Sequence, residues 1–275
     1  MERRHIKWVP LLLVGLFLAY QYFSSEKFVN PETGRKSHVA MSTREEASLG
    51  LQSYQQVLAQ SETIDSGPER DMVKRVASRL ATATGKGGAD FDWQVSVIRS
   101  PEVNAFCLPG GKIVVYTGIL PVAQNEAALA TVLGHEMAHA TSRHGSQRVL
   151  EQNLAQTALT GVAMSLSDMD YDKQRAVMGA LGVGAQFGVL MPFSRKHESE
   201  ADAIGLLYMA RAGYDPRESI RFWQRMESTG TSQPPEFLSS HPSHGTRIQQ
   251  LEAEMPKALE EYNKSSPAET PSSLR

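Results

Sequence analysis

The run His135-Glu136-Met137-Ala138-His139 constrains the fold of this chain more than any other part of the sequence. Residues four apart on an α-helix share one face, so the two imidazole rings point to one place and suit a single metal ion. The segment from Ala127 to Ala140 is largely apolar and free of proline, and Asn125 suits a helix start, so the sequence predicts a buried helix. A solvated helix with two surface histidines is the alternative, but it would need polar neighbours. Buried histidines instead need polar partners, and a metal ion is one.

The spacing matches the H-E-x-x-H motif of zinc peptidases, in which the histidines bind the metal and the glutamate takes a proton from the attacking water. His135 and His139 are therefore the expected ligands and Glu136 the expected catalytic acid/base. A catalytic zinc takes three protein ligands and keeps one position for water. The metzincin continuation is absent, because Ser142 and Gly145 stand where it requires glycine and histidine. We therefore expect the third ligand further along the chain.

A second helix is predicted to open within Phe193–Asp202 and to run on through Met209. Glu198 and Asp202 are four apart and share a face, while Glu200 projects to nearly the opposite side. If Glu198 binds the metal, Asp202 can accept the free ring N–H of a ligating histidine and fix its orientation. The spacing alone leaves an alternative open, in which these acidic residues only complement the helix dipole.

Four segments, in matching order, carry a resemblance to a known family. They are Asn104–Gly111, His135–His139, Ser194–Asp202, and His241-Pro242 followed by Arg247. They resemble the zinc metallopeptidases of family M48, the gluzincins that include HtpX, BepA, LoiP and the CAAX prenyl proteases. The resemblance covers about residues 43–262 and implies a gluzincin-like peptidase domain with a small β-sheet beside the H-E-x-x-H helix. It also implies one Zn²⁺ per chain held by His135, His139 and Glu198, with Glu136 as catalytic acid/base and Asp202 behind the ligands.

By the same resemblance, His241 and Arg247 are expected to line the metal site. A zinc peptidase needs a positive or hydrogen-bonding group near the oxyanion, and Arg247 can supply it. His241 can do the same, or it can occupy the open zinc position and hold the enzyme latent until substrate displaces it. The alternative makes His241 and His244 ordinary loop residues before a helix, with Arg247 solvated on the first turn. For His244 we favour that structural role.

Three short strands are predicted at residues 93–98, 103–108 and 112–116, with a Pro109-Gly110-Gly111 turn between the last two. Peptidases often bind substrate as an added strand on a sheet edge, because backbone hydrogen bonds hold an extended peptide without demanding one sequence. The resemblance makes Asn104, Ala105 and Phe106 that edge. An ordinary buried hairpin is the alternative. Cys107 is expected to be a small buried residue rather than a nucleophile.

Arg3, Arg4 and Lys7 precede an apolar run from Trp8 to Phe23. The run is shorter than the roughly 20 residues that a spanning helix prefers, but flanking side chains that reach the interface bring it within range. No small-residue cleavage site follows, so we favour an uncleaved membrane anchor over a signal sequence. The positive flank keeps the N-terminus in the cytoplasm. In a bacterium this predicts a single-pass inner-membrane protein with its catalytic domain in the periplasm; the alternative is secretion to the periplasm after cleavage.

The chain is expected to divide into an anchor or signal sequence at residues 1–23, a linker at 24–42, a zinc metallopeptidase domain at 43–262 and a disordered tail at 263–275. With 41% apolar residues and helices predicted before and after the strands, the domain is assigned to the α+β class and is mostly helical. The uncharged segment 176–192 could enter a membrane. Its glycines favour a close-packed internal helix instead.

A net charge of −2 excludes a general nucleic-acid binder. The leading function is a membrane-anchored zinc endopeptidase whose partners are polypeptide substrates, and the resemblance implies unfolded or misassembled envelope proteins. The alternative is a chaperone-like or binding module with a structural zinc site. Glu136 favours the enzyme, because a structural site has no use for that carboxylate. The sequence leaves the oligomeric state open.

Overall fold

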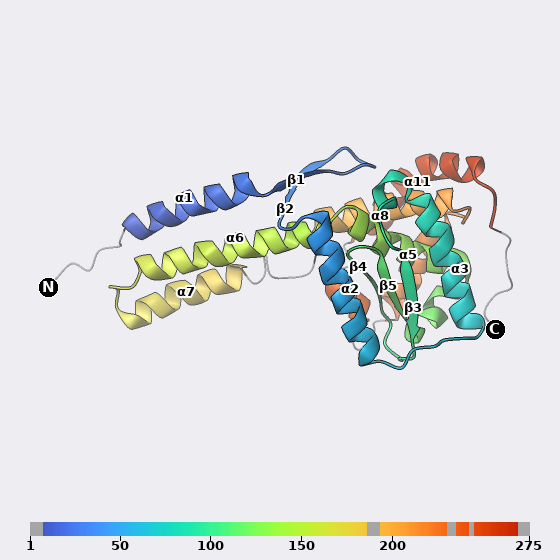
Figure 1. The fold of residues 1–275 in the computed structure, drawn as a ribbon, viewed down its shortest axis with the longest axis horizontal. Helices are drawn as coiled ribbons and strands as arrows, with labels where there is room; N and C mark the ends of the chain where they lie inside the picture. The colour runs from blue at the N-terminus through green and yellow to red at the C-terminus, as the bar shows by residue number, and fades with distance from the viewer. Residues whose placement is uncertain (1–7, 186–192, 230–234, 242–244, 269–275) are drawn as a thin grey trace. The chain divides into compact units, whose positions relative to one another are not determined.

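A computed structural model describes residues 8–185, 193–229, 235–241 and 245–268 of the chain (Figure 1). These residues divide into two compact units, each treated by itself below. The first unit takes its residues from 1–29, 36–42 and 145–191. The second takes its residues from 30–35, 43–144 and 192–275. The segments 186–192 and 269–275 and residue His244, on which some of the predictions above fall, lie outside the described residues.

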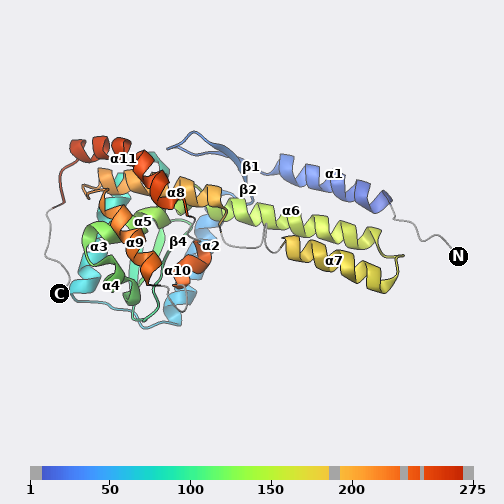
Figure 2. The same cartoon turned by 180° about the vertical axis from the view of Figure 1, so that it is seen from behind.

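The first unit is built from three helices and a β-hairpin. Its elements are α1 (Trp8–Ser24), β1 (Glu26–Val29), β2 (Lys36–Val39), α6 (His144–Ser165, in this unit from Gly145 on) and α7 (Tyr171–Ala185). Figures 1 and 2 both show α1, α6 and α7 running side by side. The side chain of Val14 lies directly over Gly161, where a Cβ atom would meet it at 2.6 Å.

Two of the predicted segments fall in this unit. Residues 24–42, expected to be a linker, contain the end of α1 and the antiparallel pair β1–β2, which runs in register from Glu26–Val39 to Val29–Lys36. Of the segment 176–192, expected to be a close-packed helix, residues 176–185 belong to α7, which begins at Tyr171, and residues 186–192 lie outside the described part of the chain. Across the described residues, no helix combines the length and the apolar character that a membrane crossing requires.

The second unit is mostly helical with one small sheet, which confirms the predicted fold class (Figure 2). Before and within the sheet lie α2 (Thr43–Ala59), α3 (Pro68–Ala83), η1 (Gly85–Gly88), β3 (Gln94–Ile98), β4 (Ala105–Leu108) and β5 (Lys112–Tyr116). After it follow η2 (Thr117–Ile119), α4 (Leu120–Ala123), α5 (Glu126–Thr141), α8 (Arg195–Arg211), α9 (Glu218–Ser228), α10 (Glu236–Ser240) and α11 (Arg247–Lys264).

The sheet of the second unit has the strand order β3-β5-β4. β5 lies in the centre, parallel to β3 and antiparallel to β4, so β4 forms one edge. Gly110 and Gly111 close the β4–β5 connection with φ of 76° and 88°, a region that residues with a Cβ rarely adopt. The predicted strands and their turn are therefore present, and β4 lies against the predicted metal helix α5.

Helix α5 is the centre of the hydrophobic core. The side chain of Asn125 caps it by accepting a hydrogen bond from the Ala128 N–H at 2.9 Å, as its position in the sequence predicts. Leu129, Val132 and Leu133 are fully buried in the main core cluster. A helix apolar on all sides is stable only inside a protein, so α5 is held from several directions.

The helices α5 and α8 cross with their backbones in direct contact. A Cβ atom added to Gly205 would lie 2.7 Å from the backbone nitrogen of His135, and one added to Gly134 would lie 2.9 Å from the carbonyl oxygen of Gly205. The weak helix former Gly134 thus has a packing role. Because this crossing adjoins His135, it brings α5, which carries His135 and His139, close to α8, which carries Glu198.

Candidate metal centre

Four side chains from two helices and the end of a third meet inside the second unit. They are His135 and His139 of α5, Glu198 of α8 and His241 at the end of α10. One ligand atom from each lies within 4.8 Å of all the others, and all four residues are buried. The two closest pairs join the Nε2 atoms of His135 and His139 at 3.1 Å and His241 Nδ1 to Glu198 Oε1 at 3.1 Å. The predicted ligands His135, His139 and Glu198 therefore come together, and His241 joins them.

The donor set of this cluster fits zinc. Imidazole nitrogens and a carboxylate oxygen are ordinary zinc ligands, and two histidines with one glutamate form the protein part of a known catalytic zinc site. Three imidazoles and a carboxylate buried this closely are costly to leave without a shared positive charge. The geometry thus supports a divalent ion held between α5 and α8, with His241 as a fourth donor.

Glu136 lies beside the cluster but is not a member of it. Its Oε2 accepts a hydrogen bond of 3.4 Å from the backbone N–H of Cys107 on β4. Its Oε1 is buried and has no hydrogen-bond partner among the described residues, although His241 Nε2 approaches to 3.4 Å. Burial raises the pKa of the Glu136 carboxyl, which makes it a better proton acceptor. A carboxylate with one free oxygen beside a metal site is placed to handle a proton.

Asp202 lies behind His135, where the spacing on α8 predicts it. Its Oδ1 is 2.8 Å from His135 Nδ1, while the Nε2 of the same ring faces His139. Burial raises the pKa of Asp202, but the neighbouring Arg247 and His135 outweigh it and lower the pKa overall. The carboxylate form is therefore favoured, and it can accept the ring proton of His135.

Arg247 is fully buried, which excludes the solvated position on the first turn of α11. Its Nη2 donates to Glu198 Oε2 at 2.6 Å and its Nε donates to Asp202 Oδ2 at 2.7 Å. The guanidinium also lies over the ring of Trp223, with 4.0 Å to the ring centroid. One cation thus compensates both buried carboxylates and holds Glu198 by its oxygen Oε2, leaving Oε1 toward His139 and His241.

The predicted edge segment lies next to Glu136. Ala105 and Phe106 begin β4, and Asn104 immediately precedes it. The carbonyl of Asn104 accepts the N–H of Tyr116 inside the sheet at 3.1 Å. Ala105 is buried, while Asn104 and Phe106 are partly exposed. Because β4 is an edge strand in the described sheet, its outer side is where an added strand would pair.

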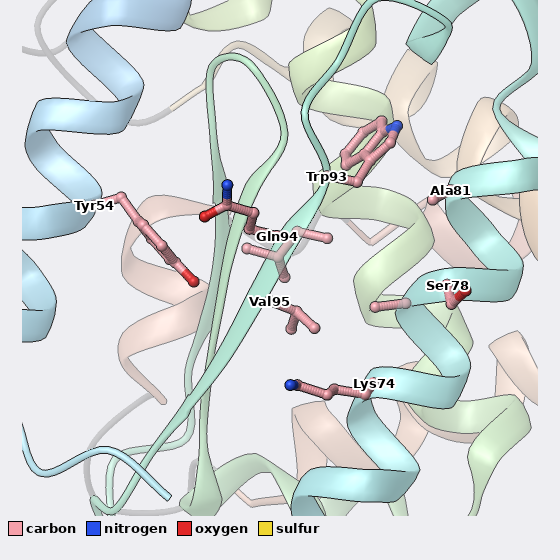
Figure 3. A pocket seen from close by; sticks show the side chains of 9 residues that line it. Tyr54, Lys74, Ser78, Ala81, Trp93, Gln94 and Val95 are labelled. Carbon is pink, nitrogen blue, oxygen red and sulfur yellow. The ribbon is translucent and has the colours of Figure 1, made fainter. Parts of the chain in front are cut away.

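A cavity of about 550 Å³ lies at the opposite edge of the sheet, between α2, α3 and β3 (Figure 3). Tyr54, Lys74, Trp93 and Val95 are among the residues that line it. None of the four cluster residues does. The cavity is therefore separate from the metal centre.

The comparison with known proteins agrees with this geometry. Residues 68–255 match the profile of Peptidase family M48. The chain is 34% identical to the mitochondrial metalloendopeptidase OMA1 of Schizosaccharomyces pombe over 93% of its own length and 74% of that protein. It is 30% identical to the OMA1 of Saccharomyces cerevisiae over 96% of this chain and 79% of the relative. It is 29% identical to the beta-barrel assembly-enhancing protease of Yersinia pestis over 79% of this chain and 45% of the relative.

Proposed function

Because this chain belongs to peptidase family M48 and is a metalloendopeptidase, we propose that it hydrolyses peptide bonds in unfolded or misassembled envelope proteins with a single Zn²⁺ held by His135, His139 and Glu198. The observation that carries the proposal is the buried cluster of three nitrogen donors and one carboxylate beside a glutamate with an unpaired oxygen. The proposed substrate class is supported by the resemblance described above and by a relative whose name assigns it to β-barrel assembly.

Zinc, when bound, supplies a Lewis acid that activates a water molecule and polarises the scissile carbonyl. The work left to the chain is proton transfer and orientation. Glu136 takes the proton of the attacking water on its free Oε1 and later gives it to the departing amine. Asp202 keeps His135 in the tautomer whose Nε2 faces the metal side. No covalent bond between enzyme and substrate is required.

We propose that His241 acts as a latch, a side chain that keeps the metal site closed until substrate displaces it. Its Nδ1 lies 3.1 Å from Glu198 Oε1 and 3.3 Å from His135 Nε2, so it takes the place of a fourth ligand. Its Nε2 points at Glu136 Oε1 from 3.4 Å. If zinc is held by His135, His139 and Glu198, His241 in this position would compete with water as a fourth donor and would cover the proton acceptor. Substrate has to displace it before hydrolysis can begin.

The role of Arg247 follows from its bonds. An oxyanion donor needs a free N–H aimed at the reacting carbonyl. Two of the guanidinium nitrogens are already bonded to Glu198 and Asp202, and Nη1 alone lacks a partner among the described residues. Arg247 therefore acts mainly by holding the ligand carboxylate. Only its Nη1 is available for the oxyanion role.

Substrate is proposed to bind as an added strand along Asn104, Ala105 and Phe106. The support is the position of β4 at the edge of the sheet and the bond from Cys107 N–H to Glu136, which puts this strand beside the catalytic carboxylate. An extended peptide paired here would lie close to the proton acceptor. This mode of binding suits unfolded substrates, since it requires an exposed backbone rather than a folded surface.

Attachment to the membrane is proposed through α1. Its side chains include some of the most exposed large apolar residues of the described chain, with Trp8 at 73% and Phe23 at 74% exposure. Apolar surface of this extent marks a contact with lipid or protein. The basic residues before it in the sequence favour a bacterial inner-membrane anchor with the catalytic unit in the periplasm. Alkaline extraction of membranes and protease accessibility of spheroplasts test this location; release by alkali would contradict the anchor.

The function itself is tested with Glu136→Gln. We expect this variant to bind zinc stoichiometrically, because Glu136 is not a ligand, and to lose cleavage of denatured casein by a factor of roughly 10² to 10⁴, the usual contribution of a general base. Metal content by atomic emission and product mapping by mass spectrometry are the measurements. Undiminished cleavage would remove Glu136 from the mechanism. Zinc binding without any cleavage by the wild type would support the chaperone-like alternative.

A further inference from the structure

A line of hydrogen bonds leads from the second metal histidine to a buried carboxylate outside the cluster. His139 Nδ1 lies 3.0 Å from Nδ1 of His144, and His144 Nε2 lies 3.0 Å from Glu200 Oε2. The other nitrogen of His139 faces the metal ligands, 3.1 Å from His135 Nε2 and 3.3 Å from Glu198 Oε1. His139 therefore has one ring nitrogen at the metal centre and the other at His144.

The directions of these bonds follow from metal binding. If His139 binds through Nε2, its proton is on Nδ1, which then donates to His144. His144 Nδ1 must accept that bond, so the proton of His144 is on Nε2 and is donated to Glu200. If both rings are neutral and His139 binds the metal through Nε2, these tautomers satisfy both the His139–His144 and the His144–Glu200 hydrogen bonds. Each ring thereby fixes the orientation of the next.

Glu200, the last residue in this series of hydrogen bonds, is itself held by several donors. Its oxygens accept hydrogen bonds from Arg35 Nε at 2.7 Å, Thr33 Oγ1 at 2.8 Å and Asn30 Nδ2 at 3.2 Å. These three residues belong to one short segment, 30–35, which is part of the second unit. Only 8% of the Glu200 side chain is exposed. A carboxylate with this many donors keeps its charge and its place.

We propose that His144 and Glu200 are positioning residues for zinc binding, orienting His139 through an imidazole as Asp202 orients His135 directly. Partners of this kind fix the tautomer and ring angle of a metal histidine, and losing one typically weakens metal affinity about 10- to 100-fold. The inference deepens the function proposed above, because it concerns the same zinc site. It assigns a role to two residues that do not belong to the ligand cluster.

The test compares variants by zinc affinity, measured in competition with a chelator, and by the visible spectrum of the Co²⁺-substituted protein. His144→Leu cannot accept from His139, so we expect zinc to bind roughly 10- to 100-fold more weakly and the cobalt bands to shift. His144→Gln is expected to restore most of the affinity, since its amide can accept from His139 and donate to Glu200. Glu200→Ala is expected to bind one zinc at saturation with an affinity about 10-fold lower.

His197 offers a matched control. Its ring is buried and stacks on His144 at a centroid distance of 4.4 Å, and in the described part of the chain it contacts His144 through this stacking and not through a hydrogen bond to a metal histidine. His197→Gln should therefore keep wild-type affinity and cobalt bands. If His144→Leu does not fold, Glu200→Ala decides. Wild-type affinity and spectrum in the folded His144→Leu or Glu200→Ala protein would overturn the proposal. A wild type that binds zinc but cleaves no peptide would overturn only the proposed function, since these readouts need no turnover.

Discussion

The imidazole of His241 contacts Glu198, a proposed metal ligand, and Glu136, the proposed proton acceptor, so its removal has a clear expected outcome. His241→Ala should raise the initial rate of peptide cleavage roughly 2- to 10-fold, because Glu136 and the open coordination position no longer need to be uncovered. The measurement is kcat/KM on an unstructured peptide at saturating zinc. Ser239→Ala, an exposed neighbour on α10, serves as control. A fall in rate would assign His241 to substrate or oxyanion binding.

The environment of Glu218 predicts how the free energy of unfolding depends on pH at a position away from the metal centre. Its carboxylate accepts bonds from Arg221 Nε at 2.6 Å, Arg225 Nη2 at 2.9 Å and Asn125 Nδ2 at 3.3 Å. Burial raises the pKa of Glu218, but these donors outweigh it, so the folded-state pKa is lower than the ordinary value of 4.5. The stabilisation is therefore fully present above pH 4.5 and is lost as the pH falls through the folded-state pKa.

We expect Glu218→Gln to lower the free energy of unfolding by about 1 to 2 kcal/mol at pH 7 and by clearly less at pH 3. Urea unfolding of metal-stripped protein at both pH values measures this difference. Glu260→Gln, at an exposed position of α11, should change little at either pH. A difference that grows toward acid would contradict the assigned direction of the pKa shift.

Single residues differ in how far their role could be read from the sequence. Glu198 and Asp202 share a helical face, so their common direction toward the histidines was predictable. The role of His144 was not, because it depends on Arg143, whose φ of 55° ends one helix and turns the chain into the next. An arginine in this backbone region is uncommon and carries no sequence signal. The burial of Arg247 likewise depends on packing between distant helices.

At the scale of elements, the crossing of α5 and α8 sets the distance between the histidines and Glu198. Gly205→Ala should destabilise the protein by about 1 to 3 kcal/mol and weaken zinc binding, because the added methyl group meets the backbone of α5. Thermal unfolding and chelator competition measure the two effects. Gly179→Ala, where nothing lies within 4 Å, is the matched control and should be neutral or slightly stabilising. Equal behaviour of the two variants would refute the close contact.

The helices of the second unit were predictable nearly to their ends, because caps and breakers stand at their termini. The helix predicted to open within Phe193–Asp202 and to run on through Met209 is α8, which spans Arg195–Arg211, and Gly213 follows it with a φ of 83°. The hairpin β1–β2 escaped prediction. Its strands have four residues each and are mostly polar, so they lack the alternation by which a strand is recognised. Each of these strands forms because it pairs with the other, and its own sequence carries little strand signal.

For the whole molecule, the metal centre couples zinc to stability. The ligands come from α5, α8 and the end of α10, so an ion that binds only the folded chain ties these elements together. At free zinc 1,000-fold above the dissociation constant the stabilisation amounts to about 4 kcal/mol. Chelation should lower the urea midpoint of the wild type accordingly. Glu198→Ala should lose both zinc and this response, and an undiminished response would move the third ligand elsewhere.

Arg247 stands at the start of the last helix in the described chain, yet it bonds to the ligand carboxylate of Glu198 and to Asp202. A nascent chain released from the ribosome only as far as residue 246 has both acids but lacks the cation that makes their burial tolerable. The cluster around Glu198 and Asp202 can therefore reach its charge-compensated arrangement only after the helix that begins at Arg247 has been synthesised.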